Sequence, residues 1–374
     1  MKKSRAAVAE KPKTAEELAQ VLHQAAETGS AVVPVGGGRS SRMGGTPLRC
    51  DVELHTTRLD RVLEHSQADM VVSVEAGITL EALQDELAKS GQFLPLDPFN
   101  SPGHTIGGLL ATGWSGPLRQ RFGSARDYLI GIRVAMPDGH LASAGGRVVK
   151  NVSGYDLMKL HYGAMGSLGV IVAASFKVFP RPLFDVTLET SSGLMGEAWT
   201  AAEQALSMPL APTALELFSD GRLLVRFCGS PDAVKRMVAE LGWKQADASV
   251  WAEHSRIGLE RWARIAVPRH ALPEIVGTLP DKARWWASPG IGIAHWSFDS
   301  ADDVVRIRHA AEKAHGSVVL MHAPDEVSKQ IGAGGTPPET IGVMRRLKKA
   351  FDLEGIGPSL SSQPSAAPAA APSA

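Results

Sequence analysis

Three glycine clusters in the first half of the chain limit what it can fold into. The first, VPVGGGRSSRMGG over residues 33–45, holds five glycines directly after a short apolar run. The second is PGHTIGGLLATGWSG over residues 102–116, and the third is GAMGSLGVI over residues 163–171. Glycine enters positive-φ backbone freely, so successive residues can turn their N–H groups toward one phosphate. The clusters together predict a nucleotide site, whereas the first cluster alone also fits a flexible surface loop.

Two common phosphate-binding motifs do not explain these glycines. The chain has no GxxxxGK[ST] sequence, which excludes a P-loop. A Rossmann fingerprint needs a helix after the glycines, but here Pro47 and the strand-like DVELHT at residues 51–56 follow Gly38. We therefore expect a nucleotide site of another kind.

Composition excludes several classes of protein. The 374 residues include 39 Lys plus Arg and 39 Asp plus Glu, so the net charge of zero argues against nucleic-acid binding. Cys50 and Cys228 form no CxxC, which argues against a disulfide framework, an iron–sulfur cluster or a metal site. No apolar run approaches the roughly 18 residues of a membrane helix, and no signal peptide is evident. A cytoplasmic protein without a membrane span is the expectation.

Local patterns predict alternating helices and strands. Thr14 and Gly29 have the residue types of an N-cap and a C-cap around an amphipathic helix. Thr79 is a second N-cap candidate, and Pro137-Asp138-Gly139 is a turn within a hairpin over residues 127–143. The other expected elements are strands at 31–35, 71–77, 169–179 and 223–229, and helices at 14–28, 79–90, 230–241 and 341–351.

The three clusters, in this order and with the hairpin between them, resemble the flavin-binding domain shared by vanillyl-alcohol oxidase, the peptidoglycan-precursor reductase and FAD-linked 2-hydroxy-acid dehydrogenases. The resemblance implies an α+β fold with a PCMH-type FAD-binding domain of two α+β subdomains over residues 10–182. A smaller α+β cap domain with a terminal helix would follow over residues 183–357. Residues 358–374, rich in Pro, Ala and Ser, are expected to form a disordered tail.

A longer stretch resembles the FAD-binding subunits of bacterial glycolate oxidases. It comprises GPLRQRFGSARDYLIGIRV at residues 116–134 and GGRVVKNVSGYDLMKLHYGAMGSLGVI at residues 145–171, of which Lys150–Leu157 is the most distinctive piece. This resemblance implies oxidation of a small 2-hydroxy acid, glycolate to glyoxylate. It also implies partners, a larger FAD-linked dehydrogenase subunit and an iron–sulfur subunit, through which the protein could associate with a membrane.

The resemblance also implies the cofactor site. Some relatives attach FAD through a histidine in the first loop or a cysteine near the second, but this chain has Arg39 and Gly103 there, so the FAD should be non-covalent. The implied cofactor-binding residues are Gly36, Gly37, Gly38, Arg39, Ser40, Ser41, Pro98, Thr105, Ile106, Gly107, Gly108, Ala111, Thr112, Gly113, Gly116, Gly169, Val170 and Ile171.

The substrate side of the reaction is less determined. The late histidine-rich motif of the full-length hydroxy-acid dehydrogenases is missing, and no catalytic residue is assigned. Arg119 and Arg121 are candidates for binding a substrate carboxylate, although solvated arginines are commoner. Two alternatives remain, a self-sufficient FAD-linked oxidase of another alcohol and an assembly subunit with a vestigial flavin site. Four histidines are isolated in the sequence and fit ordinary packing: His104, His161, His295 and His322. The tryptophans of the second half fit either packing in a core or a subunit interface.

Overall fold

Three β-sheets of three or more strands organise the chain, which the computed structural model describes over residues 7–45, 47, 49–99, 102–146, 156–255 and 260–358. The first sheet is parallel and lies beside α1 (Ala15–Thr28). Its strand order is β1 (Val8–Glu10), β3 (Val52–His55), β2 (Val32–Val35). Because β2 ends at Val35, the first glycine loop leaves from the edge of this sheet.

The second sheet is antiparallel and carries the other two glycine clusters on its connections. The α-helix α3 (Ile106–Thr112) packs against β9 near its centre. The strand order is β4 (Val62–Ser66), β5 (Val71–Glu75), β9 (Val170–Lys177), β7 (Leu129–Ala135) and β8 (Leu141–Gly145). The connections hold α2 (Leu80–Ala88), α4 (Arg119–Phe122), α5 (Ala125–Tyr128), α6 (Met158–His161) and the pair of short strands β6 (Gln92–Phe93) and β10 (Phe179–Pro180).

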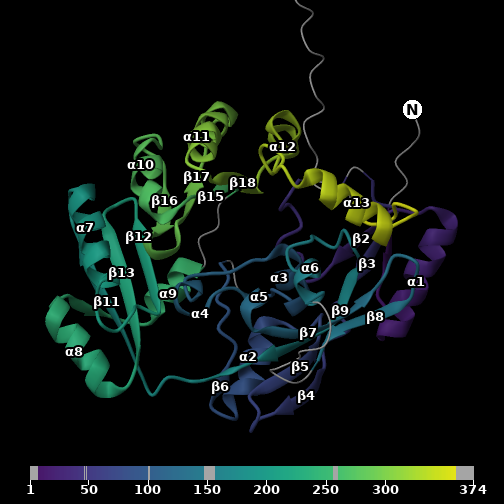
Figure 1. Ribbon diagram of the computed structural model, residues 1–374, viewed down its shortest axis with the longest axis horizontal. Helices are drawn as coiled ribbons and strands as arrows, with labels where there is room; N and C mark the ends of the chain where they lie inside the picture. Colours follow the sequence, from purple (N-terminus) through teal and green to yellow (C-terminus); the bar gives the residue numbers. More distant parts are fainter. Residues whose placement is uncertain are drawn as a thin grey trace, which may run out of the picture.

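The third sheet is antiparallel and has eight strands, and its longer helices lie on one face (Figure 1). Its order is β14 (Lys244–Ala246), β11 (Phe184–Ser191), β13 (Arg222–Gly229), β12 (Ala214–Phe218), β16 (Trp285–Ser288), β17 (Ile293–Ser297), β15 (Trp262–Ala266) and β18 (Ser317–His322). The helices packed on it are α7 (Met195–Leu206), α8 (Pro231–Leu241), α10 (Leu272–Gly277) and α11 (Ala301–Lys313). Short elements α9 (Ser249–Ser255), α12 (Asp325–Ile331) and two 3-10 turns (Arg269–Ala271, Pro289–Ile291) complete it.

Aromatic side chains join the third sheet to the glycine-rich half. The ring of Trp114, just after α3, lies 5.4 Å from that of Trp262 in β15. Phe99 lies 5.3 Å from both Trp286 and His295 on the neighbouring strands. These rings are buried and belong mostly to one hydrophobic core that spans both halves. Such edge-to-face pairs give a packed interface with a defined geometry.

The last described segment returns to the first sheet. The helix α13 (Ile341–Phe351), yellow in Figure 1, lies over the half that contains α1. Lys348 pairs with Asp352 and donates a 2.8 Å hydrogen bond to the carbonyl of Ser167. Ile356 is 2% exposed in the core of α1 and the first sheet, and its carbonyl accepts the N–H of Val32 at 2.7 Å. The division into domains at residues 182 and 183 stays a prediction, but this terminal segment packs on the first unit.

The expected elements are present near their predicted positions. Thr14 caps α1 by accepting the N–H of Glu17, and Gly29 ends it in the left-handed region. Thr79 caps α2, and β7, β8 and β9 form the predicted hairpin and the strand that follows it. Trp262, Trp285, Trp286 and Trp296 are buried, which fits the interpretation of these side chains as core. The expected tail lies outside the described residues except for Pro358.

Ile356→Ala should lower the free energy of unfolding by about 2–5 kcal/mol, because it leaves a cavity in a closed core. Leu353→Ala, three residues earlier and 78% exposed, is the matched control and should change it by less than about 0.5 kcal/mol. Urea unfolding followed by circular dichroism measures both. Equal, small effects would show that the terminal segment does not belong to this core.

Candidate functional site

A cavity of about 430 Å³ lies between the loop after β2 and the helix α3. This volume falls in the range of about 300–1,000 Å³ typical of cofactor and ligand sites. Ten of the predicted cofactor-binding residues line the cavity: Gly36, Gly37, Gly38, Arg39, Ser40, Ser41, Thr105, Gly108, Ala111 and Thr112. The structure therefore brings together residues of the first and second glycine clusters, which are about 70 positions apart in the sequence.

The first glycine loop presents free backbone donors to this cavity. Among the described residues, no acceptor takes a hydrogen bond from the backbone N–H of any residue from Gly36 to Ser41. Gly38 has a φ of 72°, so the loop alternates between backbone regions as anion-binding nests do. Unpaired N–H groups that line a cavity are suited to phosphate oxygens.

The two loops approach each other at backbone distance. A Cβ atom placed on Gly37 would lie 1.7 Å from the carbonyl oxygen of Gly103, and one on Gly36 would lie 2.2 Å from Oγ1 of Thr105. No larger residue fits at either position without separating the loops. Contact with the segment before α3 is therefore one reason for glycine at these two positions, and their part in binding the cofactor stays a prediction.

Helical periodicity explains which residues of α3 face the cavity. Thr105, Gly108, Ala111 and Thr112 lie on one face at spacings of three and four, and Ile106, Gly107, Leu109 and Leu110 are buried on the other. A Cβ on Gly108 would meet only Oγ1 of Thr105, at 3.1 Å, so a larger side chain there would extend toward the cavity.

The other predicted residues support the site from behind. Ile106 and Gly107 belong to the buried face of α3, and Gly107 donates its N–H to the carbonyl of Ala76 at 2.7 Å. Gly116 packs against the carbonyl of Asp97, next to the buried Pro98. Gly113 ends α3 beside Tyr162, and Gly169, Val170 and Ile171 pack along β7. None of these eight lines the 430 Å³ cavity.

The cavity also contains residues that were not among the predicted cofactor-binding residues. The important ones are His104 and Cys50, because imidazole and thiol groups can attach to a flavin. The Nε2 atom of His104 lies 2.9 Å from the carbonyl oxygen of Phe99, and burial lowers its pKa. Burial also raises the pKa of Cys50, so the unreactive thiol form is favoured. The remaining lining residues are Val33, Pro34, Val35, Met43, Gly44, Gly45, Pro47, Glu53, Met165, Gly166 and Pro358.

The face of the third sheet that turns toward the glycine-rich half is polar and aromatic. Phe218, Trp286, His295 and Arg264 are successive cross-strand neighbours on β12, β16, β17 and β15. The opposite face is aliphatic under α7, α8, α10 and α11. Burial, and then the charges of Arg264 and His254, hold the pKa of His295 well below its usual range, so the neutral imidazole is favoured.

Arg264 is a guanidinium without an anionic partner. No hydrogen bond or ion pair from its side chain to a described residue is present, and its Nε is buried. Burial and the nearby charge of Arg119 lower the pKa of Arg264, and the hydroxyl of Tyr162 is close to both. Arginine stays protonated in proteins, so Arg119 and Arg264 place two positive charges close together here, and Arg264 has no ion pair with a described residue.

Arg119 and Arg121, the two arginines proposed from the sequence, occupy different environments. Arg119 is partly buried in α4 near Arg264, while Arg121 is exposed.

In the part of the chain that the structure describes, no three His, Cys, Asp or Glu side chains are arranged to hold a metal ion. None of the helices described there has both the length and the apolarity for crossing a membrane. Most of the distinctive segment Lys150–Leu157 lies outside the described residues.

Comparisons with known proteins identify the kind of domain that contains this cavity. Residues 6–145 match the family of FAD binding domains. Glycolate oxidase subunit GlcE of Escherichia coli (strain K12) is 29% identical over 307 residues, which cover 79% of this chain and 82% of that protein. D-2-hydroxyglutarate dehydrogenase, mitochondrial, of Bos taurus is 28% identical over 92% of this chain and 75% of that protein. Glycolate oxidase subunit GlcD of Bacillus subtilis (strain 168) is 29% identical, but the chain covers only 46% of its length.

The solved structures show the same fold. Alkyldihydroxyacetonephosphate synthase superposes with a TM-score of 0.71 over 93% of this chain and 75% of that protein, at 18% identity. FAD is thus the cofactor of this family of domains, and the free N–H groups of the first loop fit its pyrophosphate.

Gly108→Leu should reduce bound FAD about tenfold or more, because the new side chain extends into the cavity while the helix tolerates leucine. Flavin released by acid precipitation and measured by absorbance per chain gives the content. Gly342→Leu in α13, where a Cβ meets open space, is the control and should keep the wild-type content. A yellow Gly108→Leu protein with full FAD would exclude this cavity as the site.

Proposed function

We propose that this protein is the FAD-binding subunit of a complex that oxidises a small 2-hydroxy acid, with glycolate as the first substrate to test. Residues 6–145 match the FAD binding domains. The chain is an FAD-linked oxidoreductase of the glycolate oxidase and D-lactate dehydrogenase family. When bound, FAD accepts the hydride from the α-carbon, which is the redox step that the protein alone cannot supply.

The first loop and α3 would hold the cofactor without a covalent bond. The N–H groups of Gly36 to Ser41 would donate to the pyrophosphate, and Arg39 would add a positive charge. The side chains that line the cavity from α3 are small, so a flat group can lie against the backbone. Arg39 and Gly103 provide no attachment atom, and Cys50 is favoured as the thiol.

The observation that carries the substrate proposal is the unpaired Arg264. A half-buried guanidinium with no carboxylate partner, beside a second arginine and a tyrosine hydroxyl, is suited to a substrate carboxylate. We propose that Arg264 binds it, with Arg119 and Tyr162 nearby. Gly113 at the end of α3 touches the ring of Tyr162, so this cationic region lies next to the cofactor domain.

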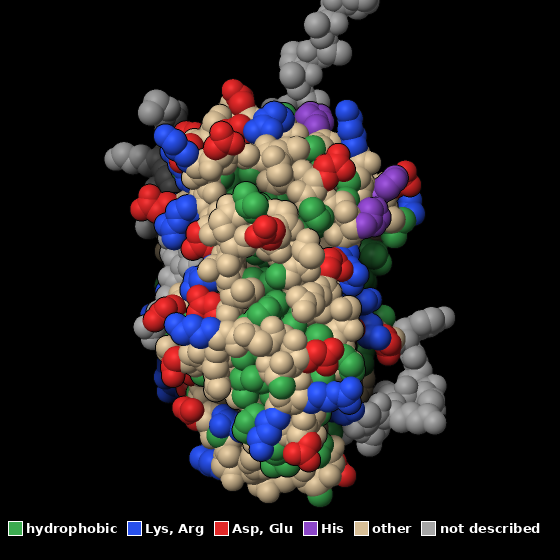
Figure 2. All heavy atoms as spheres, turned by 90° about the vertical axis from the view of Figure 1, so that its left-hand side faces the viewer, with side chains coloured by type: hydrophobic (Ala, Val, Ile, Leu, Met, Phe, Trp, Pro, Cys, Tyr) green, Lys and Arg blue, Asp and Glu red, His purple; other side chains and the backbone are tan. Residues whose placement is uncertain are grey.

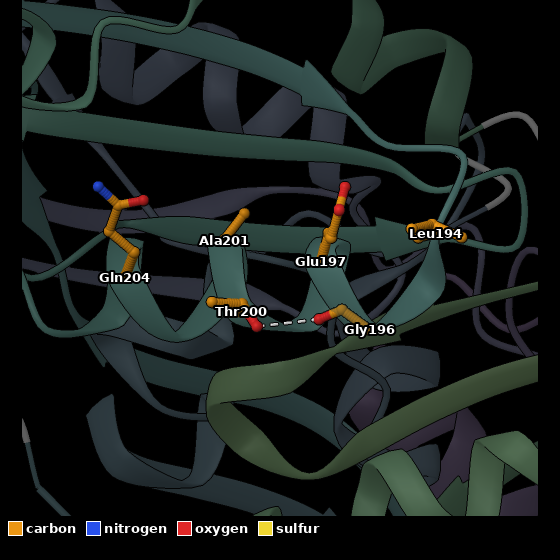
Figure 3. A pocket seen from close by; sticks show the side chains of 6 residues that line it. All are labelled: Leu194, Gly196, Glu197, Thr200, Ala201 and Gln204. Carbon is orange, nitrogen blue, oxygen red and sulfur yellow. Dashed lines mark hydrogen bonds between the residues drawn. The ribbon is translucent and has the colours of Figure 1, made fainter.

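The partner proposal rests on the relatives and on one surface. This chain lacks the late histidine-rich motif, and it matches proteins named as glycolate oxidase subunits. Figure 2 shows the face over the third sheet's helices, with few charged side chains along its middle. An open groove on α7 lies on this side of the molecule and is lined by Leu194, Gly196, Glu197, Thr200, Ala201 and Gln204 (Figure 3). Leu194 is 65% exposed there, and we propose that a partner subunit covers it.

The two alternatives differ from this proposal in measurable ways. A self-sufficient oxidase would reduce a dye with the isolated chain. A vestigial flavin site would give a colourless protein that still assembles, but the unpaired N–H groups of the first loop favour a working site.

Arg264→Gln should lower kcat/KM for glycolate about 10- to 150-fold, mostly through KM, because it removes a charged hydrogen bond worth about 1.5–3 kcal/mol. The assay is dye reduction by the protein co-expressed with its partner subunits. Arg121→Gln changes an exposed arginine and should leave kcat/KM within about twofold. An unchanged KM in Arg264→Gln would exclude the carboxylate role.

The isolated chain should reduce a dye with glycolate at a small fraction of the rate per flavin that the co-expressed complex shows, because the chain lacks the late histidine-rich motif of the full-length hydroxy-acid dehydrogenases. Leu194→Asp should reduce co-purification of the partners, while Leu353→Asp, also exposed but after α13, should not. Equal rates per flavin for chain and complex would favour the self-sufficient oxidase.

A further inference from the structure

A second cavity, of about 240 Å³, lies at one end of the third sheet, where the turn from β12 to β13 meets the start of β16 and the end of α9. It shares no lining residue with the cavity between the glycine loops. Its wall includes Phe218, Arg222, His254, Trp285 and Trp286.

Three side chains of this wall contribute buried polar atoms that have no hydrogen-bond partner among the described residues. These atoms are Nε of Arg222, Nε1 of Trp286 and Nδ1 of His254, whose other ring nitrogen faces Glu216. Trp286 and His254 are each 3% exposed, so bulk water does not solvate them. Arginine and tryptophan nitrogens only donate, and an imidazole always carries at least one N–H donor. Buried donors without acceptors that line one cavity indicate a ligand rich in acceptors.

Neighbouring contacts hold two of these donors in place. The guanidinium of Arg222 lies 4.4 Å from the ring centroid of Phe218, a cation–π contact that fixes its plane. The Nε2 atom of His254 lies 3.7 Å from Oε2 of Glu216, while Oε1 of Glu216 accepts the hydroxyl of Ser288 at 2.6 Å. Burial raises the pKa of Glu216. The donors are therefore oriented before any ligand arrives.

Charge is distributed unevenly around the cavity. The two acidic side chains, Asp220 and Glu253, are exposed at its rim, and Asp220 accepts the backbone N–H of Arg222 at 3.0 Å. Arg284 is a second cation at the rim. Inside, the charged group is Arg222. An anion would thus meet donors in the interior, and the rim acids could accept a hydrogen bond from a ligand hydroxyl.

We propose that this cavity is a second ligand site, which binds a small organic acid through its carboxylate on Arg222, Trp286 and His254. It is separate from the cationic region at Arg264. Strand β17 lies between β16, which carries Trp286, and β15, which carries Arg264, so the two strands are about 10 Å apart. The proposed oxidation does not depend on it.

The test is calorimetric titration of the FAD-loaded full chain carrying Arg264→Gln, which weakens the proposed substrate site. Glycolate is the probe, and inorganic phosphate is the second arm. Glycolate should still bind with one site per chain. Adding Arg222→Gln or Trp286→Phe, which keeps the ring but removes the N–H, should weaken this binding about tenfold or more. Arg121→Gln in the same background is the control and should have no effect.

Each outcome decides the proposal. Loss of glycolate binding in both added variants, with an unchanged melting temperature in Arg222→Gln, supports the site. Absence of binding in the Arg264→Gln background, or binding unchanged by both added variants, overturns it, and the cavity then holds water only. Binding of phosphate but not glycolate overturns the carboxylate assignment. Failure of the proposed oxidation is read separately, from turnover by the wild-type complex.

Discussion

The close contact between two backbone segments, Gly37 and Gly103, is the constraint on which the cofactor site depends. Their separation leaves no room for a Cβ atom on Gly37, so the first loop and the segment before α3 are fixed relative to each other. Because the loops support each other, the N–H groups of Gly36 to Ser41 stay free of internal acceptors. A nest that is arranged before the ligand binds loses less conformational entropy on binding.

The third sheet combines an aliphatic face with a polar and aromatic one. Its helices cover the aliphatic face, so the polar face is left to meet the cofactor domain. The rings of Phe99 and Trp114 pack onto that face and exclude water from part of it. Burial of the charged and ionisable groups beside them lowers the pKa values of Arg264 and His295. Perturbed groups of this kind concentrate at functional sites.

Local signals explain why much of the fold could be predicted from the sequence. Thr14, Gly29 and Thr79 cap helices through the backbone next to them, so these helix ends can be predicted without the rest of the chain. The glycine clusters were recognisable by their order. The polar face of the third sheet was not, because Glu216, Arg264 and His295 come from separate strands, and their apposition depends on the register of long-range pairing. His104 gave no signal either, since its role depends on a cavity wall made by a loop about 65 residues earlier.

The return of Ile356 to the first core has a consequence for how such proteins can diversify. The N-terminal strands and the segment around Ile356 close one structural unit, and the eight-stranded sheet lies between them in the sequence. That sheet is therefore an insertion whose two ends are anchored in the same body. Its strands can change in length and chemistry while the nucleotide-holding unit keeps both of its chain ends and its core. A change confined to the inserted sheet can then alter the face that this sheet presents without disturbing the core around Ile356.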